Sequence, residues 1–251
     1  MAGLGWRRGT LSADGALAAT VVGASTFGFG GWPAGLSLIA FFVTGSALSR
    51  RKPVSGELPS AKGHRRDAVQ VLANGGFAAL GTVLAGLGYR RGQGAALGAV
   101  AAAAADTWAS EIGVRSPTPP RSLLTGEMVL PGTSGGVTPL GWAASAAGAS
   151  LIGVTWTLSS DRRPHALWVA LAAGLAGTLA DSLAGATLQA AYCCTVCGAP
   201  SETLGEHCGQ PRQLVRGHAW ITNDVVNGIG TAAGALVGAA LLPPSRKSVL
   251  T

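Results

Sequence analysis

The feature that most constrains this chain is a series of apolar stretches, most of them long enough to cross a membrane. A helix that crosses the hydrocarbon core needs about 20 mostly apolar residues. Seven such stretches recur, the second being the shortest: 11–29, 33–48, 67–87, 92–112, 138–158, 166–190 and 223–242. Only 12% of the 251 residues are charged, against about 25% in soluble domains. We therefore predict an all-α, polytopic integral membrane protein, with residues 1–251 forming a single membrane domain of about seven transmembrane helices.

The basic residues indicate how these helices are oriented. With the N-terminus in the cytoplasm or its topological equivalent, 12 of the 18 lysines and arginines fall on the inner side. Because basic loops stay inside, this orientation predicts a cytoplasmic linker at 49–66, a cytoplasmic Gly-rich loop at 113–137 and a cytoplasmic Cys-containing loop at 191–221. Anionic lipid and an anionic substrate explain the net charge of +7, so we expect no nucleic acid partner.

Six acidic residues lie within or at the ends of the apolar stretches. Besides Asp14 and Asp67, near helix starts, these are Asp106, Glu111, Asp181 and Asp224. A charge at the bilayer centre costs about 2.5–3.5 kcal/mol on insertion scales, so such side chains face a cavity or a partner. In the orientation set by the basic residues, all six lie toward the cytoplasmic half. Since carboxylates bind hard cations, we predict that the last four of these residues are catalytic and hold Mg²⁺. For Asp224, at a helix start, a structural role is the alternative.

The Gly-rich loop ends in Pro131-Gly-Thr-Ser-Gly-Gly136 and leads directly into an apolar helix. Backbone N–H groups at a glycine loop and a helix N-terminus bind phosphate. The loop lacks the lysine of a P-loop, and glycines also simply make turns. We predict that Thr133, Ser134 and Gly135 bind the phosphate of a substrate.

Further polar residues gather before the third and seventh helices. The predicted substrate-binding residues there are Lys62, Arg65, Arg66, Asn74 and Asn223. Asn74 shares a helix face with Asp67 and Gln70 because their spacing is i, i+3, i+7. A polar face inside a membrane points to a cavity or to another helix, so hydrogen bonding between helices is the alternative to substrate binding.

All four cysteines occur in the Cys-containing loop. The pattern Cys194-x-x-Cys197 with His207-Cys208 predicts a possible structural zinc site. The adjacent histidine and cysteine depart from ordinary ligand spacing, so reduced thiols without metal are the alternative. Disulfides are disfavoured if the loop is cytoplasmic.

Six motifs follow one another along the chain: RGTLSADGAL (8–17), QVLANGG (70–76), ADTWASEIG (105–113), PGTSGGV (131–137), ADSLAGATLQ (180–189) and TNDVVN (222–227). Together they resemble the transmembrane-protein-19-like (DUF92) integral membrane family, and the resemblance runs from about residue 7 to 241. That family includes the phytyl-phosphate kinases of plants and cyanobacteria.

The resemblance implies a membrane kinase that transfers a phosphoryl group from a nucleoside triphosphate, CTP being preferred, to a phytyl-type isoprenyl monophosphate. The product is the diphosphate used in tocopherol synthesis. The implied location is a bacterial inner membrane, or a plastid membrane in a phototrophic eukaryote, with the site on the cytoplasmic or stromal side. Phosphoryl transfer between two anions needs charge neutralisation and alignment, which a Mg²⁺ site and basic residues supply.

Other function classes share part of this pattern. A secondary transporter of an anionic or lipid-phosphate substrate also has buried carboxylates and broken helices. It should show inverted repeats and polar groups on both membrane sides, whereas the acidic residues here cluster on one side. A CDP-alcohol phosphotransferase or a cytidylyltransferase would use the same metal chemistry, but its dense aspartate motif is absent from this sequence.

Overall fold

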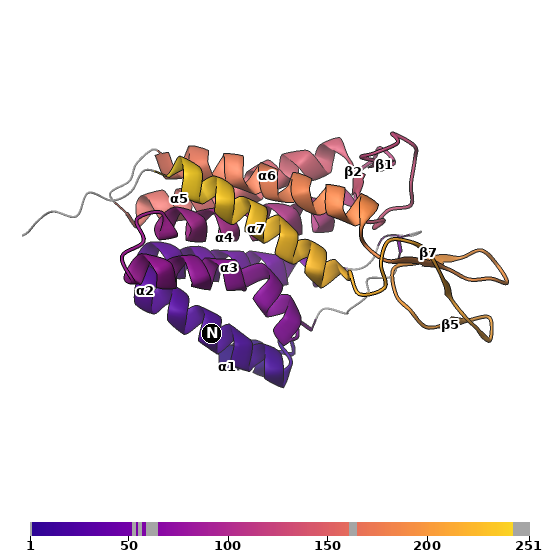
Figure 1. The fold of residues 1–251 in the computed structure, drawn as a ribbon, viewed down its shortest axis with the longest axis horizontal. Coiled ribbons are helices and arrows are strands. Elements are labelled where there is room, and N and C mark those ends of the chain that lie inside the picture. The colour runs from indigo at the N-terminus through magenta and orange to yellow at the C-terminus, as the bar shows by residue number, and fades with distance from the viewer. Residues whose placement is uncertain (1, 52–53, 55–56, 59–64, 161–164, 243–251) are drawn as a thin grey trace, which may run out of the picture.

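The computed structural model describes residues 2–51, 54, 57–58, 65–160 and 165–242, which form a helix bundle with small strands at one end (Figure 1). A short helix, α1 (Ala2–Arg7), precedes the bundle. The long helices are α2 (Ala13–Leu48), α3 (Ala68–Gly86), α4 (Gly92–Gly113), α5 (Pro139–Leu158), α6 (His165–Thr187) and α7 (Asn223–Leu241). The predicted all-α membrane fold is confirmed.

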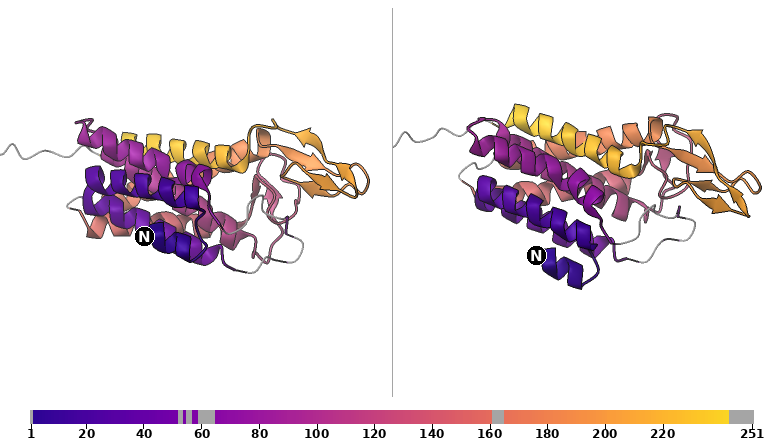
Figure 2. Two further views of the ribbon diagram at one scale, coloured as in Figure 1. Left: turned by 90° about the horizontal axis from the view of Figure 1, so that it is seen from below. Right: turned by 60° about the horizontal axis from the view of Figure 1, so that its bottom comes forward.

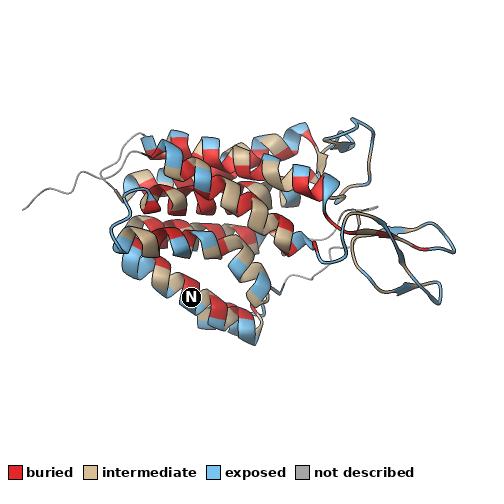
Figure 3. Ribbon diagram, in the orientation of Figure 1, coloured by how far each residue is buried: buried red, intermediate tan, exposed pale blue. Residues whose placement is uncertain are grey.

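Among the described residues, four helices are long and apolar enough to cross a membrane by length and composition alone: α2, α3, α6 and α7. Helix α4, of 22 residues, lies between them and packs against α3, α5, α6 and α7. Every residue from 96 to 105 of α4 is buried (Figure 3). Small side chains let neighbouring helices approach closely, which explains why 8 of the 10 residues from 96 to 105 are alanine or glycine.

Helix α2 is interrupted at Gly31, whose φ of +67° is a conformation that glycine adopts readily. The two halves fold back on each other as a hairpin. Across the turn, the Phe27 ring packs on Gly35 and meets Trp32 edge to face. Each half rises roughly 26 Å, close to the thickness of a bilayer core. The predicted helices 11–29 and 33–48 therefore correspond to the two halves of this hairpin.

Side chains at the helix starts fix the ends of α2 and α3 together. Asp67 caps α3 and forms a capping box with Gln70, which is a stabilising arrangement at a helix N-terminus. Ser12 caps α2 through the Gly15 N–H. Asp14 accepts hydrogen bonds from the Ser12 hydroxyl and from the Ala68 N–H. Asp67 and Gln70, which the spacing places on one polar face, thus have a structural role.

Glycines allow α4, α6 and α7 to pack at very short range. A Cβ atom on Gly98 of α4 would lie 2.0 Å from the Gly234 carbonyl oxygen of α7, and one on Gly177 of α6 would lie 2.4 Å from Ala102. Side chains larger than hydrogen do not fit at these positions. This packing accounts for a large part of the glycine content of the chain.

The strands lie in the two long connections at one end of the bundle (Figure 2). In the Gly-rich loop, β1 (Arg121–Ser122) pairs antiparallel with β2 (Gly136–Val137). In the Cys-containing loop, β3 (Ala191–Cys193) lies between β4 (Pro200–Ser201) and β7 (Gln213–Arg216), and β5 (Glu206–His207) pairs with β6 (Gln210–Pro211). The sequence predicts the position of both loops but not their strands.

Candidate functional site

A cavity of about 1300 Å³ opens at the end of the bundle that carries the strands, between the helices and the two loops. Ten of the predicted site residues line it: Arg66, Asn74, Asp106, Glu111, Thr133, Ser134, Gly135, Asp181, Asn223 and Asp224. They come from segments up to 158 positions apart in the sequence. The fold therefore brings most of the predicted site into one place.

One predicted substrate contact, Arg65, is not part of this lining. Arg65 is exposed, and its Nε donates to the Leu11 carbonyl oxygen at 3.2 Å, outside the cavity wall. Lys62 lies outside the described residues. Asn74 lines the cavity, and its amide also donates to the Gln70 carbonyl oxygen at 3.0 Å, so it bonds within its own helix as well.

Three aspartates reach the cavity from three different helices: Asp106 from α4, Asp181 from α6 and Asp224 from α7. Asp181 Oδ2 is buried and has no hydrogen-bond partner in the described part of the chain. The carboxylates of Asp106 and Glu202 lie near enough to interact with the charge of Asp181. Buried carboxylates without a partner are costly unless a cation neutralises them. Carboxylate oxygens are the donor type that a hard divalent cation such as Mg²⁺ prefers.

Arg66 and Glu111 form a second charged part of the cavity wall. The guanidinium of Arg66 lies 5.6 Å from the ring centroid of Phe41 and 5.8 Å from that of Phe42. Burial lowers the pKa of Arg66, while the negative charge of Glu111 opposes this shift. Glu111 also accepts a hydrogen bond from the Ser49 hydroxyl. Arginine stays charged in proteins, so Arg66 supplies a fixed positive charge to the cavity wall.

The Gly-rich loop packs directly on α6. Gly135 has a φ of +79°, and a Cβ atom there would lie 2.4 Å from the Cβ of Ala186, so only glycine fits. Ser134 donates through its N–H and its hydroxyl to Glu202 at 2.7 and 2.8 Å. Gln189 of the segment after α6 donates to the same carboxylate at 2.9 Å. The predicted phosphate donors of Ser134 are thus engaged by an acidic side chain.

Glu202 is a cavity residue that the sequence analysis does not identify. It comes from the Cys-containing loop, directly after β4. Only two acidic residues occur between positions 191 and 221, Glu202 and Glu206. No sequence signal singles it out, because the loop carries two arginines as well as these two acidic residues.

The cavity also has a long apolar part. Its lining extends along the α2 hairpin and includes Val22, Phe27, Gly35 and Leu38. Along the second half of α2 the apolar lining runs from Gly35 to Phe42, a rise of about 11 Å. Phe27 and Gly35 lie close to the turn at Gly31, at the far end from the aspartates. A single cavity thus connects a charged end with an apolar branch.

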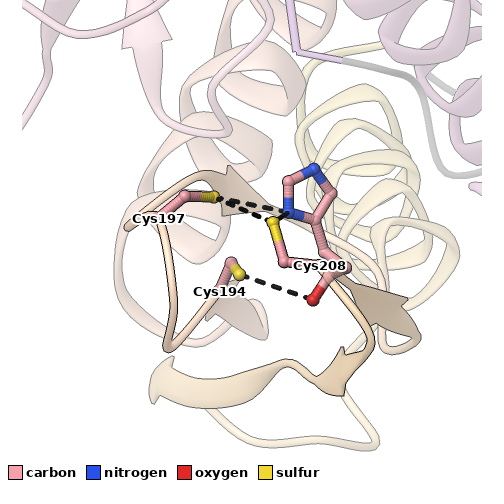
Figure 4. A group of neighbouring side chains, drawn as sticks. Cys194, Cys197 and Cys208 are labelled. Carbon is pink, nitrogen blue, oxygen red and sulfur yellow. Dashed lines mark hydrogen bonds between the residues drawn. The ribbon is translucent and has the colours of Figure 1, made fainter.

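The four predicted zinc ligands form a separate cluster: Cys194, Cys197, His207 and Cys208 (Figure 4). Their ligand atoms all lie within 4.8 Å of one another. The Cys197 N–H and the His207 side chain lower the pKa of the Cys194 thiol to about 6, and the hydrogen bond with Cys197 raises that of Cys208 to about 11. The fourth cysteine of the chain, Cys193, is not part of this cluster.

The sequence matches the family model described as integral membrane protein DUF92 over residues 1–235. It is 31% identical over 237 residues to Protein PGR of Arabidopsis thaliana, covering 81% of this chain and 82% of the relative. It is 33% identical over 180 residues to an uncharacterized membrane protein of Methanocaldococcus jannaschii, covering 71% and 75%. No solved structure matches it. The chain therefore belongs to the DUF92 family of integral membrane proteins.

Proposed function

We propose that this protein is a membrane kinase that transfers a phosphoryl group from a nucleoside triphosphate, preferably CTP, to an isoprenyl monophosphate of the phytyl type. The observation that supports this most is the cavity with two chemically different parts. Its charged end suits two phosphate groups and a divalent cation, and its apolar branch suits a hydrocarbon tail. The resemblance to the phytyl-phosphate kinases supplies the substrate class.

In this proposal Asp106, Asp181 and Asp224, with Glu111 at the cavity mouth, hold Mg²⁺. When bound, the ion would supply neutralisation of the charge on the phosphate oxygens. The unpartnered, buried Oδ2 of Asp181 is the feature of the chain that favours a cation there. Gly230 packs against Asp181, with a Cβ position only 3.2 Å from that of the aspartate, so the absence of a side chain at Gly230 leaves room beside the carboxylate.

Arg66 and the Gly-rich loop orient the phosphates of the two substrates. Arg66 offers a planar guanidinium that suits phosphate oxygens. Thr133, Ser134 and the Gly135 backbone face the cavity from the other side. Because Glu202 engages both donors of Ser134, a phosphate that binds Ser134 must displace this carboxylate. Asn74 and Asn223 hold the remaining ligand oxygens.

The reaction needs no strong general base. An oxygen of the acceptor phosphate attacks the terminal phosphorus of the nucleotide, the bond from that phosphorus to the bridging oxygen breaks, and the nucleoside diphosphate leaves. The second pKa of a phosphate monoester is about 6, so the acceptor is largely ionised at neutral pH. Alignment and charge neutralisation therefore carry the catalysis.

The apolar branch along α2 accommodates the isoprenoid tail in this proposal. Its walls are aliphatic and aromatic side chains, which run along the second half of α2 for about 11 Å, from Gly35 to Phe42. A tail in this branch keeps the attached phosphate at the boundary between membrane and water. We place that boundary on the cytoplasmic side of a bacterial inner membrane, or on the stromal side in a plastid.

The direct test is an assay of purified protein in detergent with Mg²⁺, labelled CTP or ATP, and phytyl, geranylgeranyl and farnesyl monophosphates. We expect a labelled isoprenyl diphosphate, formed fastest with CTP. No diphosphate from any acceptor would refute the kinase proposal. Proton- or sodium-coupled uptake of an anionic or lipid-phosphate substrate into liposomes would instead support a secondary transporter.

A further inference from the structure

We propose that Cys194, Cys197, His207 and Cys208 bind one structural zinc ion in the Cys-containing loop. The four residues come from two hairpins that are separate in the sequence. Cys194 and Cys197 lie in the turn between β3 and β4, and His207 and Cys208 lie in the β5–β6 hairpin. This proposal is independent of the kinase activity, since it concerns a different part of the molecule.

The distances among the ligand atoms of Cys197, His207 and Cys208 match a tetrahedral zinc site. Zinc lies about 2.3 Å from thiolate sulfur and about 2.0–2.1 Å from histidine nitrogen. A tetrahedron with these bonds has sulfur–sulfur edges of about 3.8 Å and sulfur–nitrogen edges of about 3.5 Å. The Sγ atoms of Cys197 and Cys208 are 3.8 Å apart. His207 Nδ1 lies 3.4 Å from Cys197 Sγ and 3.3 Å from Cys208 Sγ.

The ligand types favour zinc over a hard cation, and a structural role over a catalytic one. Thiolate ligands select soft or borderline metals, whereas Mg²⁺ and Ca²⁺ prefer oxygen. Three cysteines and one histidine complete a four-coordinate shell, which leaves no open position for water or substrate. The magnesium proposed for the cavity and the zinc proposed here therefore require different donor sets.

The backbone around Cys208 supports a ligand role. Cys208 has a φ of +54° and is the only non-glycine residue with positive φ in the described part of the chain. It precedes Gly209, with a φ of +72°, in a two-residue hairpin turn of a kind that favours Asn-Gly. Cysteine is disfavoured in this positive-φ backbone conformation, so the turn itself does not explain the residue. A metal that binds its sulfur accounts for the choice of residue.

The loop has little else to stabilise it. Its strands are two to four residues long, and several of its large apolar side chains are exposed, among them Val196, Leu204 and Val215. Small units that bury too little apolar surface are held by a metal or by disulfides. All four cysteines are free thiols, so a metal is the crosslink that this loop offers.

The zinc site also lies next to the cavity wall. Glu202 follows β4 and precedes β5, so it lies in the segment between the two hairpins that the metal would join. Zinc binding would therefore hold Glu202 in reach of Ser134 and Gln189. Loss of the metal should loosen this segment without changing the helix bundle.

Metal analysis of the full-length protein tests the proposal. The protein is purified in detergent with a tag that contains no histidine, and its metals are measured by mass spectrometry. We expect about one zinc per chain and loss of that zinc in Cys197→Ser and in Cys208→Ser. Cys193→Ser is the matched control, because Cys193 lies beside Cys194 but outside the cluster, and it should keep the zinc.

Cobalt substitution gives a second readout, which uses the wild-type protein and so does not depend on whether the variants fold. Cobalt-loaded wild-type protein should show thiolate-to-cobalt charge transfer and the intense visible bands of a tetrahedral ion. One equivalent of iron in place of zinc would overturn the proposal. So would zinc retained by a double variant of Cys197 and Cys208, or wild-type protein with neither zinc nor a tetrahedral cobalt spectrum.

Discussion

At the scale of single residues, Asp106 and Asp181 test the metal assignment most directly. We expect Asp106→Asn and Asp181→Asn each to lower diphosphate formation by about two orders of magnitude or more, because an amide binds Mg²⁺ poorly. The fold should persist, since removing a buried charge relieves its desolvation cost. Turnover and the thermal unfolding temperature in detergent are the measurements.

Glu127→Gln is the control for these two variants. Glu127 is exposed in the Gly-rich loop and does not line the cavity. The Glu127→Gln variant loses the same charge as the aspartate variants. Because that charge lies outside the cavity lining, diphosphate formation should stay at the wild-type level. Wild-type rates in both aspartate variants would rule out the proposed magnesium ligands.

Single residues also show how far the sequence leads. Asp106 and Asp181 are recognisable in the sequence because a carboxylate inside an apolar helix is costly, whereas Asp224 lies in the first turn of its helix. Glu202 lacks that signal, since it lies in a polar loop. Its contact with Ser134 joins positions 68 residues apart, and only the folded chain brings them together.

At the scale of helices, the close packing of α4 on α7 should be sensitive to one methyl group. Gly98→Ala places a Cβ atom 2.0 Å from the Gly234 carbonyl oxygen. We expect a loss of about 1–3 kcal/mol in the free energy of unfolding, because the helices must separate. Thermal unfolding in detergent measures this as a lower midpoint.

Gly76→Ala is the matched control for this packing. Gly76 lies inside α3, and a Cβ atom there would meet nothing within 4 Å. Alanine is the better helix former, so stability should stay constant or rise. If Gly98→Ala and Gly76→Ala lowered the free energy of unfolding equally, the tight contact between α4 and α7 would not be the cause of the loss.

The apolar branch beside α2 should select the length of the acceptor. Leu38→Trp narrows the branch halfway along the hairpin. We expect the ratio of turnover with phytyl monophosphate to turnover with farnesyl monophosphate to fall by about tenfold. Leu80→Trp, on an exposed position of α3, should leave the ratio unchanged. An unchanged ratio in Leu38→Trp would place the tail elsewhere.

Element boundaries follow from the sequence where the signal is long. The predicted helices agree with α3 to α7 to within a few residues, because a run of about 20 apolar residues flanked by polar loops has few other interpretations. The break between residues 29 and 33 is also visible in Gly31 and Pro33. Helix α1 and the strands of two to four residues were missed, since segments this short show no periodicity.

At the scale of the whole molecule, the orientation can be tested by labelling. An impermeant maleimide should label Arg90→Cys, between α3 and α4, in intact bacterial cells. Thr118→Cys, in the Gly-rich loop, should react only after lysis. Both positions are exposed, and the native cysteines are expected on the inner side with Thr118. Labelling of Thr118→Cys in intact cells would reverse the proposed topology.

The two-part cavity has a kinetic consequence. If the protein is the proposed kinase, a nucleotide would reach the charged end from water, whereas a prenylated phosphate would arrive sideways from the lipid phase. The two reactants would then use different entrances, so either could bind first. The reaction rate would depend on the mole fraction of acceptor in the membrane and not on its bulk concentration. Adding inert lipid would therefore lower the rate, while the nucleotide concentration needed for half-maximal rate would stay the same.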